Sequence, residues 1–306
     1  MIINLPTSEN MTKLALRLHF GAWAALTTME FQFDQEFESS EENDWASERA
    51  EYYEYCQPEL QAICTIIQQS NELALKARLC QVSPYLLLLN SDAKFSTKGD
   101  DIDFTTFRTI DAVDLPAAIN SFCDDKLTDK FLQTYGQIRA YRNQITHMGE
   151  TKKAFSPREL LHHLVAQYRE LWPQRHWLQD RVEFAAQTTT AFFHDGRYAS
   201  AESVVMEEWE HTFDVLTGTE FKALFGKPKT TRRYYCLDCV EAASTKAFHA
   251  PDTECRTAFL LPGGTSLHCF MCGKDSNVVR EDCPAGCPGN VMSSAGETGQ
   301  CHTCLQ

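Results

Sequence analysis

The sequence predicts a mainly α-helical protein that ends in a small cysteine-rich module. Several long segments before residue 173 have apolar residues at three- and four-residue steps, the spacing of one buried helix face. Nine of the 13 cysteines fall after residue 235, and eight of these stand in close pairs. Residues 1–221 carry 19 basic and 34 acidic side chains, whereas residues 222–306 carry 9 and 8. These changes predict a helical bundle over 1–177, a helical extension or linker over 178–228 and the cysteine-rich module over 229–306.

The helices of the bundle are expected in five segments, 11–33, 45–82, 115–122, 128–148 and 156–172. Ser8 is a candidate cap for the first, and Ser156 followed by Pro157 is typical of a helix start. Pro58 either kinks the second segment or lies in the first turn of a separate helix. Segment 37–48 is expected to be a loop or a solvated helix start, and segment 90–113 a loop with a short turn of structure.

The fourth helical segment places a charge where an apolar residue is expected. Arg142 falls near the middle of its apolar stripe, which is formed by Phe131, Tyr135, Ile138, Tyr141, Ile145 and Met148. A guanidinium in that position keeps its charge and needs an anion. Glu72 either supplies this anion or forms a surface pair with Lys76, four residues further along its own helix.

His147 follows Arg142 by five positions on the same predicted helix. At 100° per residue the two side chains point roughly 140° apart. They converge only if the helix loosens toward Gly149 or if a second subunit supplies one of them. Arg139, one turn before Arg142, is a further candidate contact to a nucleic-acid phosphate.

The pattern Arg142, Asn143, three further residues and His147, late in an all-helical domain, resembles the motif of the HEPN superfamily. Residues 71–89, with Glu72-Leu-x-x-Lys76 before Ser-Pro and an aliphatic run, look like the second helix of such domains. The resemblance covers about residues 10–175. It implies a HEPN-like bundle that dimerises with its motif helices facing each other, and metal-independent cleavage of RNA through the ribose 2′-hydroxyl.

In that interpretation each residue of the motif has a chemical role. The imidazole of His147 exchanges a proton with the 2′-hydroxyl or the leaving oxygen. Arg142 stabilises the phosphate charge in the transition state, and Asn143 orients His147 or the phosphate. Relatives of this kind act as toxins of toxin-antitoxin systems or as phage-defence effectors. Alternatively, Arg142 braces the bundle through Glu72, His147 caps the last carbonyls of its helix, and the protein is a non-catalytic, zinc-stabilised adaptor for nucleic acid or protein.

The cysteine pairs after residue 235 have the spacing of a zinc ribbon. Cys236 and Cys239 form one pair, Cys269 and Cys272 another, and the residues between the pairs predict a hairpin with its turn at 262–264. A second set is formed by Cys283, Cys287, Cys301 and Cys304. A swapped pairing, in which Cys269 and Cys272 join Cys283 and Cys287, also fits the spacing. Either arrangement predicts about two structural zinc ions per chain, and no cofactor for catalysis.

The remaining expectations concern partners and location. The net charge of −14 argues against non-specific binding of nucleic acid over the whole surface, so any phosphate contacts are expected to be local. Arg232 and Arg233, beside Tyr234 and Tyr235, are candidate RNA contacts. They belong to a basic group with Lys222, Lys227 and Lys229, and the alternative is that this group is only a solvated face. A homodimer, an RNA substrate and a regulatory or antitoxin partner are expected. Since neither a signal peptide nor a membrane-spanning run is evident, we expect a cytoplasmic protein without a membrane partner.

Overall fold

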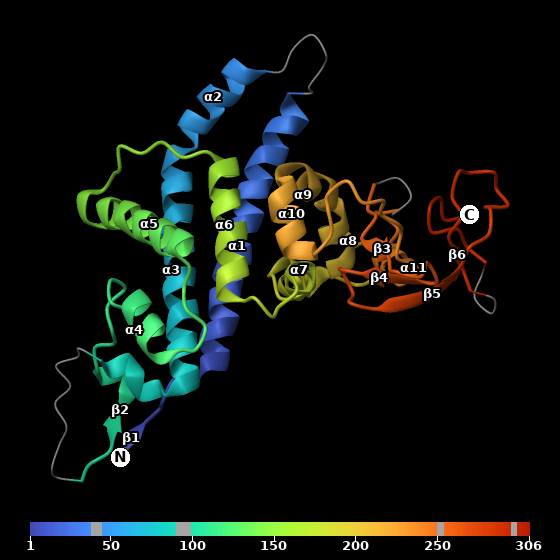
Figure 1. Ribbon diagram of the computed structural model, residues 1–306. Coiled ribbons are helices and arrows are strands. Elements are labelled where there is room, and N and C mark those ends of the chain that lie inside the picture. Colours follow the sequence, from blue (N-terminus) through green and yellow to red (C-terminus); the bar gives the residue numbers. More distant parts are fainter. Residues whose placement is uncertain (38–44, 90–98, 250–253, 295–298) are drawn as a thin grey trace. The chain divides into compact units, whose positions relative to one another are not determined.

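The computed structural model describes residues 1–37, 45–89, 99–249, 254–294 and 299–306 of the chain. The chain divides into two compact units, Met1–Pro173 and Gln174–Gln306 (Figure 1). The predicted class is confirmed at its coarse level, because the protein is mainly helical and carries a small antiparallel sheet near the C-terminus. Within the described ranges, no helix has the length and apolar character needed to cross a membrane.

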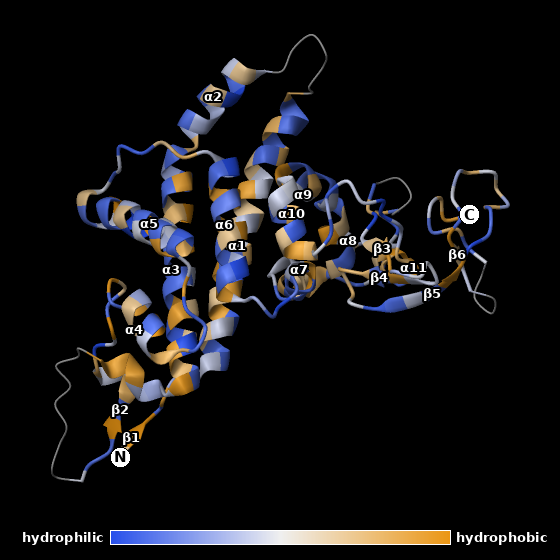
Figure 2. Cartoon of the chain, in the orientation of Figure 1, coloured by the Kyte–Doolittle hydropathy of each residue, from blue (hydrophilic) through white to orange (hydrophobic). Residues whose placement is uncertain are grey.

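The first unit is a helical bundle built around one long helix. Helix α3 contacts α1, α4, α5 and α6. The helices are α1 (Ser8–Glu36), α2 (Ala46–Tyr55), α3 (Gln57–Val82), α4 (Leu115–Phe122), α5 (Asp129–Met148) and α6 (Pro157–Leu171). Its core contains fully buried large side chains from α1, α3 and α6, which include Trp23, Leu26, Leu60, Ile67, Leu75 and Tyr168. In contrast, Figure 2 shows α5 as a mostly hydrophilic helix with few apolar positions.

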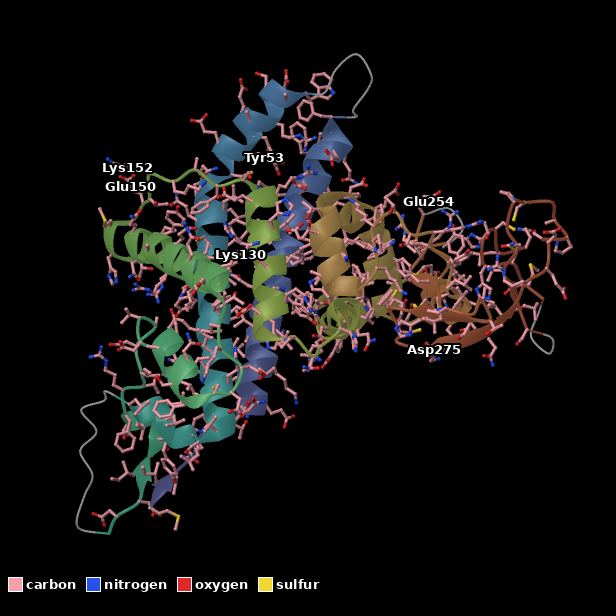
Figure 3. All side chains as sticks on the ribbon, viewed as in Figure 1. Tyr53, Lys130, Glu150, Lys152, Glu254 and Asp275 are labelled. Carbon is pink, nitrogen blue, oxygen red and sulfur yellow. The ribbon has the colours of Figure 1, made fainter. Side chains whose placement is uncertain are left out.

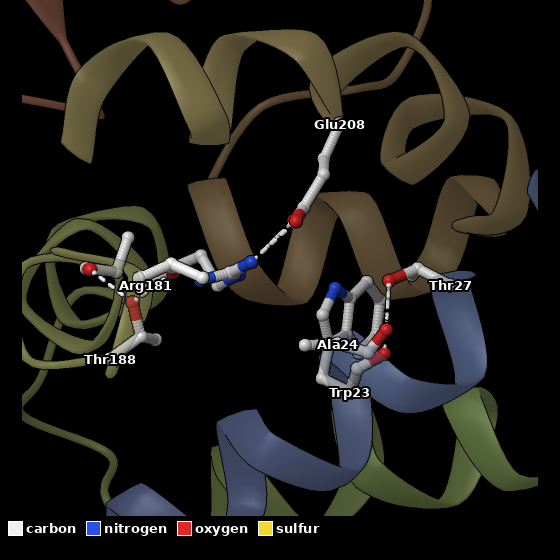
Figure 4. Close-up of polar contacts among 8 residues, drawn as sticks. Trp23, Ala24, Thr27, Arg181, Thr188 and Glu208 are labelled. Atoms are coloured by element: carbon white, nitrogen blue, oxygen red, sulfur yellow. Dashed lines mark hydrogen bonds and ion pairs between the residues drawn. The ribbon is translucent and has the colours of Figure 1, made fainter. Parts of the chain in front are cut away.

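Local signals explain where these helices begin and end. Pro58 lies in the first turn of α3, so the predicted long segment is two helices and not one kinked helix. The α1 cap is Thr7 and not Ser8, since the Thr7 side chain accepts from the backbone N–H of Asn10. Inside α1, the Thr27 hydroxyl donates to the carbonyl oxygens of Trp23 and Ala24, each at 3.1 Å (Figure 4). These contacts satisfy the buried hydroxyl without breaking the helix.

The predicted loops are described only in part, since residues 38–44 and 90–98 lie outside the described ranges. The remainder of segment 90–113 includes the strand β2 (Ile102–Asp103) and the short 3-10 helix η2 (Phe104–Thr106). Strand β2 pairs in parallel with β1 (Ile2–Ile3), a contact that the sequence did not predict. A further 3-10 helix, η1 (Pro84–Leu88), follows α3.

The second unit joins short helices to a four-stranded sheet. Its helices are α7 (Trp177–Ala185), η3 (Thr190–Phe193), α8 (Ala201–Glu207), α9 (Trp209–Val215), α10 (Gly218–Phe225) and α11 (Leu237–Ala243). The sheet has the order β3 (Ala258–Leu260), β4 (Ser266–Cys269), β5 (Asp275–Val279) and β6 (Met292–Ser293), all antiparallel. The predicted hairpin is β3–β4, whereas β5 and β6 were not predicted.

Aromatic rings and one ion pair hold the helical part of this unit together. Phe221 contacts Phe225 and Phe259, with ring centroids 4.7 and 6.2 Å apart. The side chain of Arg181 on α7 is 3% exposed and forms a two-pronged ion pair with Glu208, between α8 and α9 (Figure 4). Because a buried guanidinium without a carboxylate is strongly destabilising, this pair fixes α7 against the α8–α9 junction.

Candidate functional site

Helix α5 carries the candidate catalytic residues and has well-defined ends. The Thr128 side chain accepts from the N–H of Phe131 at its start, and Gly149, with φ of 81°, ends it in the left-handed conformation. Only Phe131, Tyr135 and Ile138 are buried along the helix. Arg142 comes four residues after Ile138 and continues the same face.

Arg142 is paired with Glu72 at the edge of the helical core. The guanidinium Nη2 donates to Glu72 Oε1, and the two side chains are 24% and 20% exposed. Gln68 Nε2 donates to the same carboxylate oxygen at 3.3 Å, which holds Glu72 in place. Lys76, the other candidate partner of Glu72, donates instead to Thr109 Oγ1 at 3.0 Å. The carboxylate thus neutralises a guanidinium that remains partly open to solvent.

The end of α5 lies outside the core, which corrects one expectation. The predicted apolar stripe should have buried Ile145 and Met148, but Ile145 is only half-buried and Met148 is 74% exposed. Tyr141 is the last aromatic residue of α5, and its ring centroid lies 5.5 Å from that of Phe155. Figure 3 shows Glu150 and Lys152 just past this end of the helix. In the single chain, the last turn of α5 therefore lies at the surface.

His147 is the histidine of the first unit that is most open to a ligand. It is exposed in the last turn of α5, and no hydrogen bond or ion pair joins it to another residue in the described ranges. By contrast, burial lowers the pKa of His19 to about 3 and also lowers the pKa of His163. His19 is enclosed in the core and His163 is half-buried beside Glu159, so both are less open to a substrate than His147.

The other residues of the motif helix lie near Arg142. Asn143 and Arg139 are both half-buried on α5. Apart from Nη2, the guanidinium nitrogens of Arg142 make no hydrogen bond within the described part of the chain. Because a guanidinium has five N–H donors, one pair to Glu72 leaves donors for a second anion. The helix therefore offers a pre-oriented cation, a half-buried amide and an exposed imidazole.

The first group of four cysteines connects α11 to the sheet. Cys236 and Cys239 lie at the start of α11, Cys269 ends β4, and Cys272 lies in the turn before β5. The sulfurs of Cys236 and Cys272 are 3.8 Å apart, and those of Cys239 and Cys269 are 3.6 Å apart. Four sulfurs bound to one zinc ion at ~2.3 Å stand about 3.8 Å from one another. The spacing therefore matches a tetrahedral metal site.

Backbone geometry supports this first group. Gly273, with φ of 74°, donates its N–H to the carbonyl of Cys269 at 2.9 Å and closes the turn. The N–H of Met271 also donates to the Cys269 sulfur, at 3.4 Å. Hydrogen bonds among the four thiols lower the pKa of Cys269 and Cys272 and raise the pKa of Cys236 and Cys239, because the four close sulfurs share their protons. A metal binds thiolates, so its binding would release the protons that remain.

The second group consists of Cys283, Cys287, Cys301 and Cys304. Its sulfur pairs Cys283–Cys304 and Cys287–Cys301 are 3.6 and 3.7 Å apart. The structure thus forms two sequential groups of four, and the swapped pairing is not the one adopted. A Cβ at Gly289 would lie 2.6 Å from Thr303 and 2.9 Å from the Cys301 sulfur, so the loop around this group requires glycine there.

The thirteen cysteines are all free thiols, which excludes a disulfide framework in this structure. Sulfur separations of 3.6–3.8 Å within the two groups are far longer than a disulfide bond of ~2.05 Å. Cys255 belongs to neither group, since its sulfur donates to the carbonyl of Met206 at 2.6 Å. His302 also lies outside, with Nδ1 2.8 Å from the carbonyl oxygen of Tyr235. Each group could hold one metal ion, about two per chain.

No protein-family model, curated protein or solved structure matches the chain.

Proposed function

We propose that the first unit is a metal-independent endoribonuclease of the HEPN type, and that the second unit binds two structural zinc ions. One observation carries the proposal. An exposed, unpartnered imidazole and a partly neutralised guanidinium lie on one surface-facing helix, at His147 and Arg142. Within the described parts of the chain, no hydrogen bond or ion pair joins His147 to another residue. Both groups are of the kind that RNA cleavage without a metal requires.

The chemistry assigned to these residues is an internal transfer at phosphorus. The ribose 2′-oxygen bonds to phosphorus, the 5′-oxygen of the next nucleotide leaves, and the products carry a 2′,3′-cyclic phosphate and a 5′-hydroxyl. His147 takes the 2′-hydroxyl proton or gives one to the leaving oxygen. Arg142, through its unused N–H groups, stabilises the charge that grows on the phosphate. Asn143 orients the imidazole or the phosphate.

A second copy of the chain completes the site. Since His147 and Arg142 point roughly 140° apart around a regular helix, one chain cannot direct both at one phosphate. Met148, 74% exposed, and the half-buried Ile145 add apolar surface at the same end of α5. Two α5 ends facing each other cover this surface and bring an arginine of one copy near the histidine of the other. We therefore propose a homodimer as the active form.

The proposed setting is that of a toxin or phage-defence effector restrained by a regulatory protein. The zinc ions take no part in the reaction. A site closed by four thiolates leaves no position for water or substrate, so each ion supplies structure alone. The hydrophobic cluster around the second group has Cys283, Met292 and Cys301 as its buried residues, so few large apolar side chains are available and metal binding replaces a hydrophobic core.

One observation favours a second function, a non-catalytic zinc-stabilised adaptor that binds nucleic acid or protein. Glu72 neutralises Arg142 in the single chain, so the guanidinium can serve as a brace between α3 and α5. In this interpretation the α5 end is a docking surface and His147 has no chemical task. The two functions differ in one outcome, because only the first breaks RNA.

Incubation with total RNA in the presence of EDTA tests the proposal. We expect fragments with 2′,3′-cyclic phosphate and 5′-hydroxyl ends, detected by end-specific ligation and sequencing, and no breakage of the corresponding DNA. Short exposure to EDTA should leave the initial rate unchanged, because no metal acts in the reaction. If the wild-type protein cuts no RNA, alone or with candidate activators, the nuclease proposal fails and the adaptor function replaces it.

A further inference from the structure

The second unit contains a pocket of about 360 Å³ that is rich in basic side chains, which we call the basic pocket. It is lined by Lys229, Thr230, Thr231, Arg232, Arg233, Arg256 and Thr303. Arg232 and Arg233 were candidates from the sequence, but Arg256 and Thr303 come from distant segments. The pocket thus combines the segment before Cys236, the residue after Cys255 and the residue before Cys304.

Aromatic rings hold the arginines of the basic pocket in fixed directions. The guanidinium of Arg233 lies 3.5 Å from the ring centroid of Phe213. Arg232 lies 5.3 Å from the ring of Tyr234, and Arg256 lies 4.9 Å from that of Tyr235. Such stacking reduces the rotamer freedom that a ligand would otherwise have to restrict.

The basic pocket has few negative charges of its own. Arg256 is paired with Glu254, which is 60% exposed and is labelled in Figure 3. For Lys229, Arg232 and Arg233, no carboxylate lies within ion-pair distance in the ranges that the structure describes. Burial, and next the charge of Arg256, lower the pKa of Arg233, while the carboxylates of Glu254 and Asp214 act in the opposite direction. Cations crowded in this way are stabilised by a multivalent anion.

Hydroxyl groups complete a donor set suited to phosphate. Arg232 Nη2 donates to Thr303 Oγ1 at 3.4 Å, so the hydroxyl proton of Thr303 remains available to a phosphate oxygen. Thr230 and Thr231 line the same pocket. Its volume exceeds the need of a lone phosphate ion and leaves room for an attached sugar. None of the residues that line the pocket is aromatic, so the pocket offers no ring on which a base could stack.

We propose that the basic pocket binds the phosphate group of a nucleotide, either free or within an RNA strand, without base specificity. The site belongs to the second unit and does not depend on cleavage at α5. It would give a chain of net charge −14 one local place at which to hold RNA.

The two cysteine groups keep the basic pocket in shape. The N–H of Tyr235 donates to the carbonyl of His302 at 2.8 Å, which joins the segment before Cys236 to the residues between Cys301 and Cys304. Tyr234 pairs with Ala258 at the edge of the sheet. The basic segment is therefore held on both sides by elements that the metal sites organise.

Fluorescence anisotropy with a labelled single-stranded oligoribonucleotide tests this site on the full-length, zinc-loaded protein. His147→Ala serves as the background, so the RNA stays intact whether or not α5 is catalytic. We expect Arg232→Gln and Arg256→Gln each to weaken binding about tenfold, because each removes a charged contact to phosphate. The double variant should also lower the slope of log Kd against log salt by about 1.4, at about 0.7 per lost contact. Lys222→Gln, an exposed cation outside the pocket, is the matched control and should bind as the background protein does.

Competition by inorganic phosphate and by a nucleoside monophosphate identifies the source of the bound phosphate. Competition by both at millimolar concentration indicates a site for free nucleotides, and competition by RNA alone indicates one for the strand; both support the proposal. Equal binding by the background protein, the double variant and the Lys222→Gln control would overturn it. So would equal competition by polyglutamate at matched ionic strength, since that would reveal a general anion surface. Because the readout is binding, failure here leaves the proposed cleavage at α5 untouched.

Discussion

Alanine at position 147 should lower the rate of RNA cleavage by about 10²–10⁴-fold, the usual loss when a general acid or base is removed. His147 is exposed and has no polar partner in the described ranges, so its removal should not disturb folding. The rate is measured on a short RNA under single-turnover conditions, and folding is checked by thermal melting. His176→Ala, which removes an exposed histidine of the second unit, is the matched control and should retain the wild-type rate.

Arg142 needs a more careful substitution than alanine. Removing its charge would leave Glu72, 20% exposed, without its partner and would destabilise the contact between α3 and α5. Arg142→Lys keeps the positive charge but loses the planar fork that binds phosphate in two places. We expect a 10²–10³-fold lower rate with little change in the melting temperature. Arg158→Lys, an exposed arginine on α6, should cleave normally. Full activity in both His147→Ala and Arg142→Lys would show that these residues of α5 take no part in the reaction.

Removal of zinc should unfold the cysteine-rich part of the second unit, residues 229–306, while the helices of the first unit persist. Structural zinc contributes on the order of 10 kcal/mol per site, and the cysteine-rich part has few large apolar residues to replace it. Prolonged incubation with a strong chelator should therefore reduce the near-ultraviolet signal and expose the cysteine-rich part to proteolysis. The first unit, with its large apolar core, should survive as a protected fragment.

Elemental analysis of the zinc content shows which cysteines hold the metal. We expect about two zinc ions per chain for the wild type, and about one for Cys283→Ser, which removes a ligand of the second group. Cys123→Ser, a half-buried cysteine outside both groups, should keep two. A wild-type protein with no bound metal, or one whose eight paired cysteines are oxidised to disulfides, would contradict the assignment.

Local chemistry made much of the fold predictable. The bounds of α4 agree with the expected segment 115–122, and Pro58 and Ser156 lie at helix starts as such residues usually do. The eight cysteines of the two groups followed from spacing, because a short loop between paired cysteines suits one tetrahedral ion, but the spacing also allowed the swapped pairing and only the structure shows the sequential one. These features depend on residues that are neighbours along the chain.

Features that depend on distant segments were not predictable in the same way. The face of α5 was expected correctly as far as Ile138, but periodicity cannot say how far a neighbouring helix extends, and Met148 is exposed. The parallel pairing of Ile2 with Ile102 has no local signature. Nor could spacing have placed Arg256 beside Arg232, since their approach depends on the fold of the whole second unit.

A single 2′-deoxynucleotide in an otherwise ribose substrate tests the central claim most directly. The substitution removes the attacking hydroxyl at one bond and leaves the phosphate, the bases and all other bonds unchanged. If Arg142 and His147 promote attack by the 2′-oxygen, the strand should remain uncut at that bond while the other bonds break at the wild-type rate. Cleavage at the deoxy position at an unchanged rate would show that water or another nucleophile attacks the phosphate, which would contradict the proposed reaction.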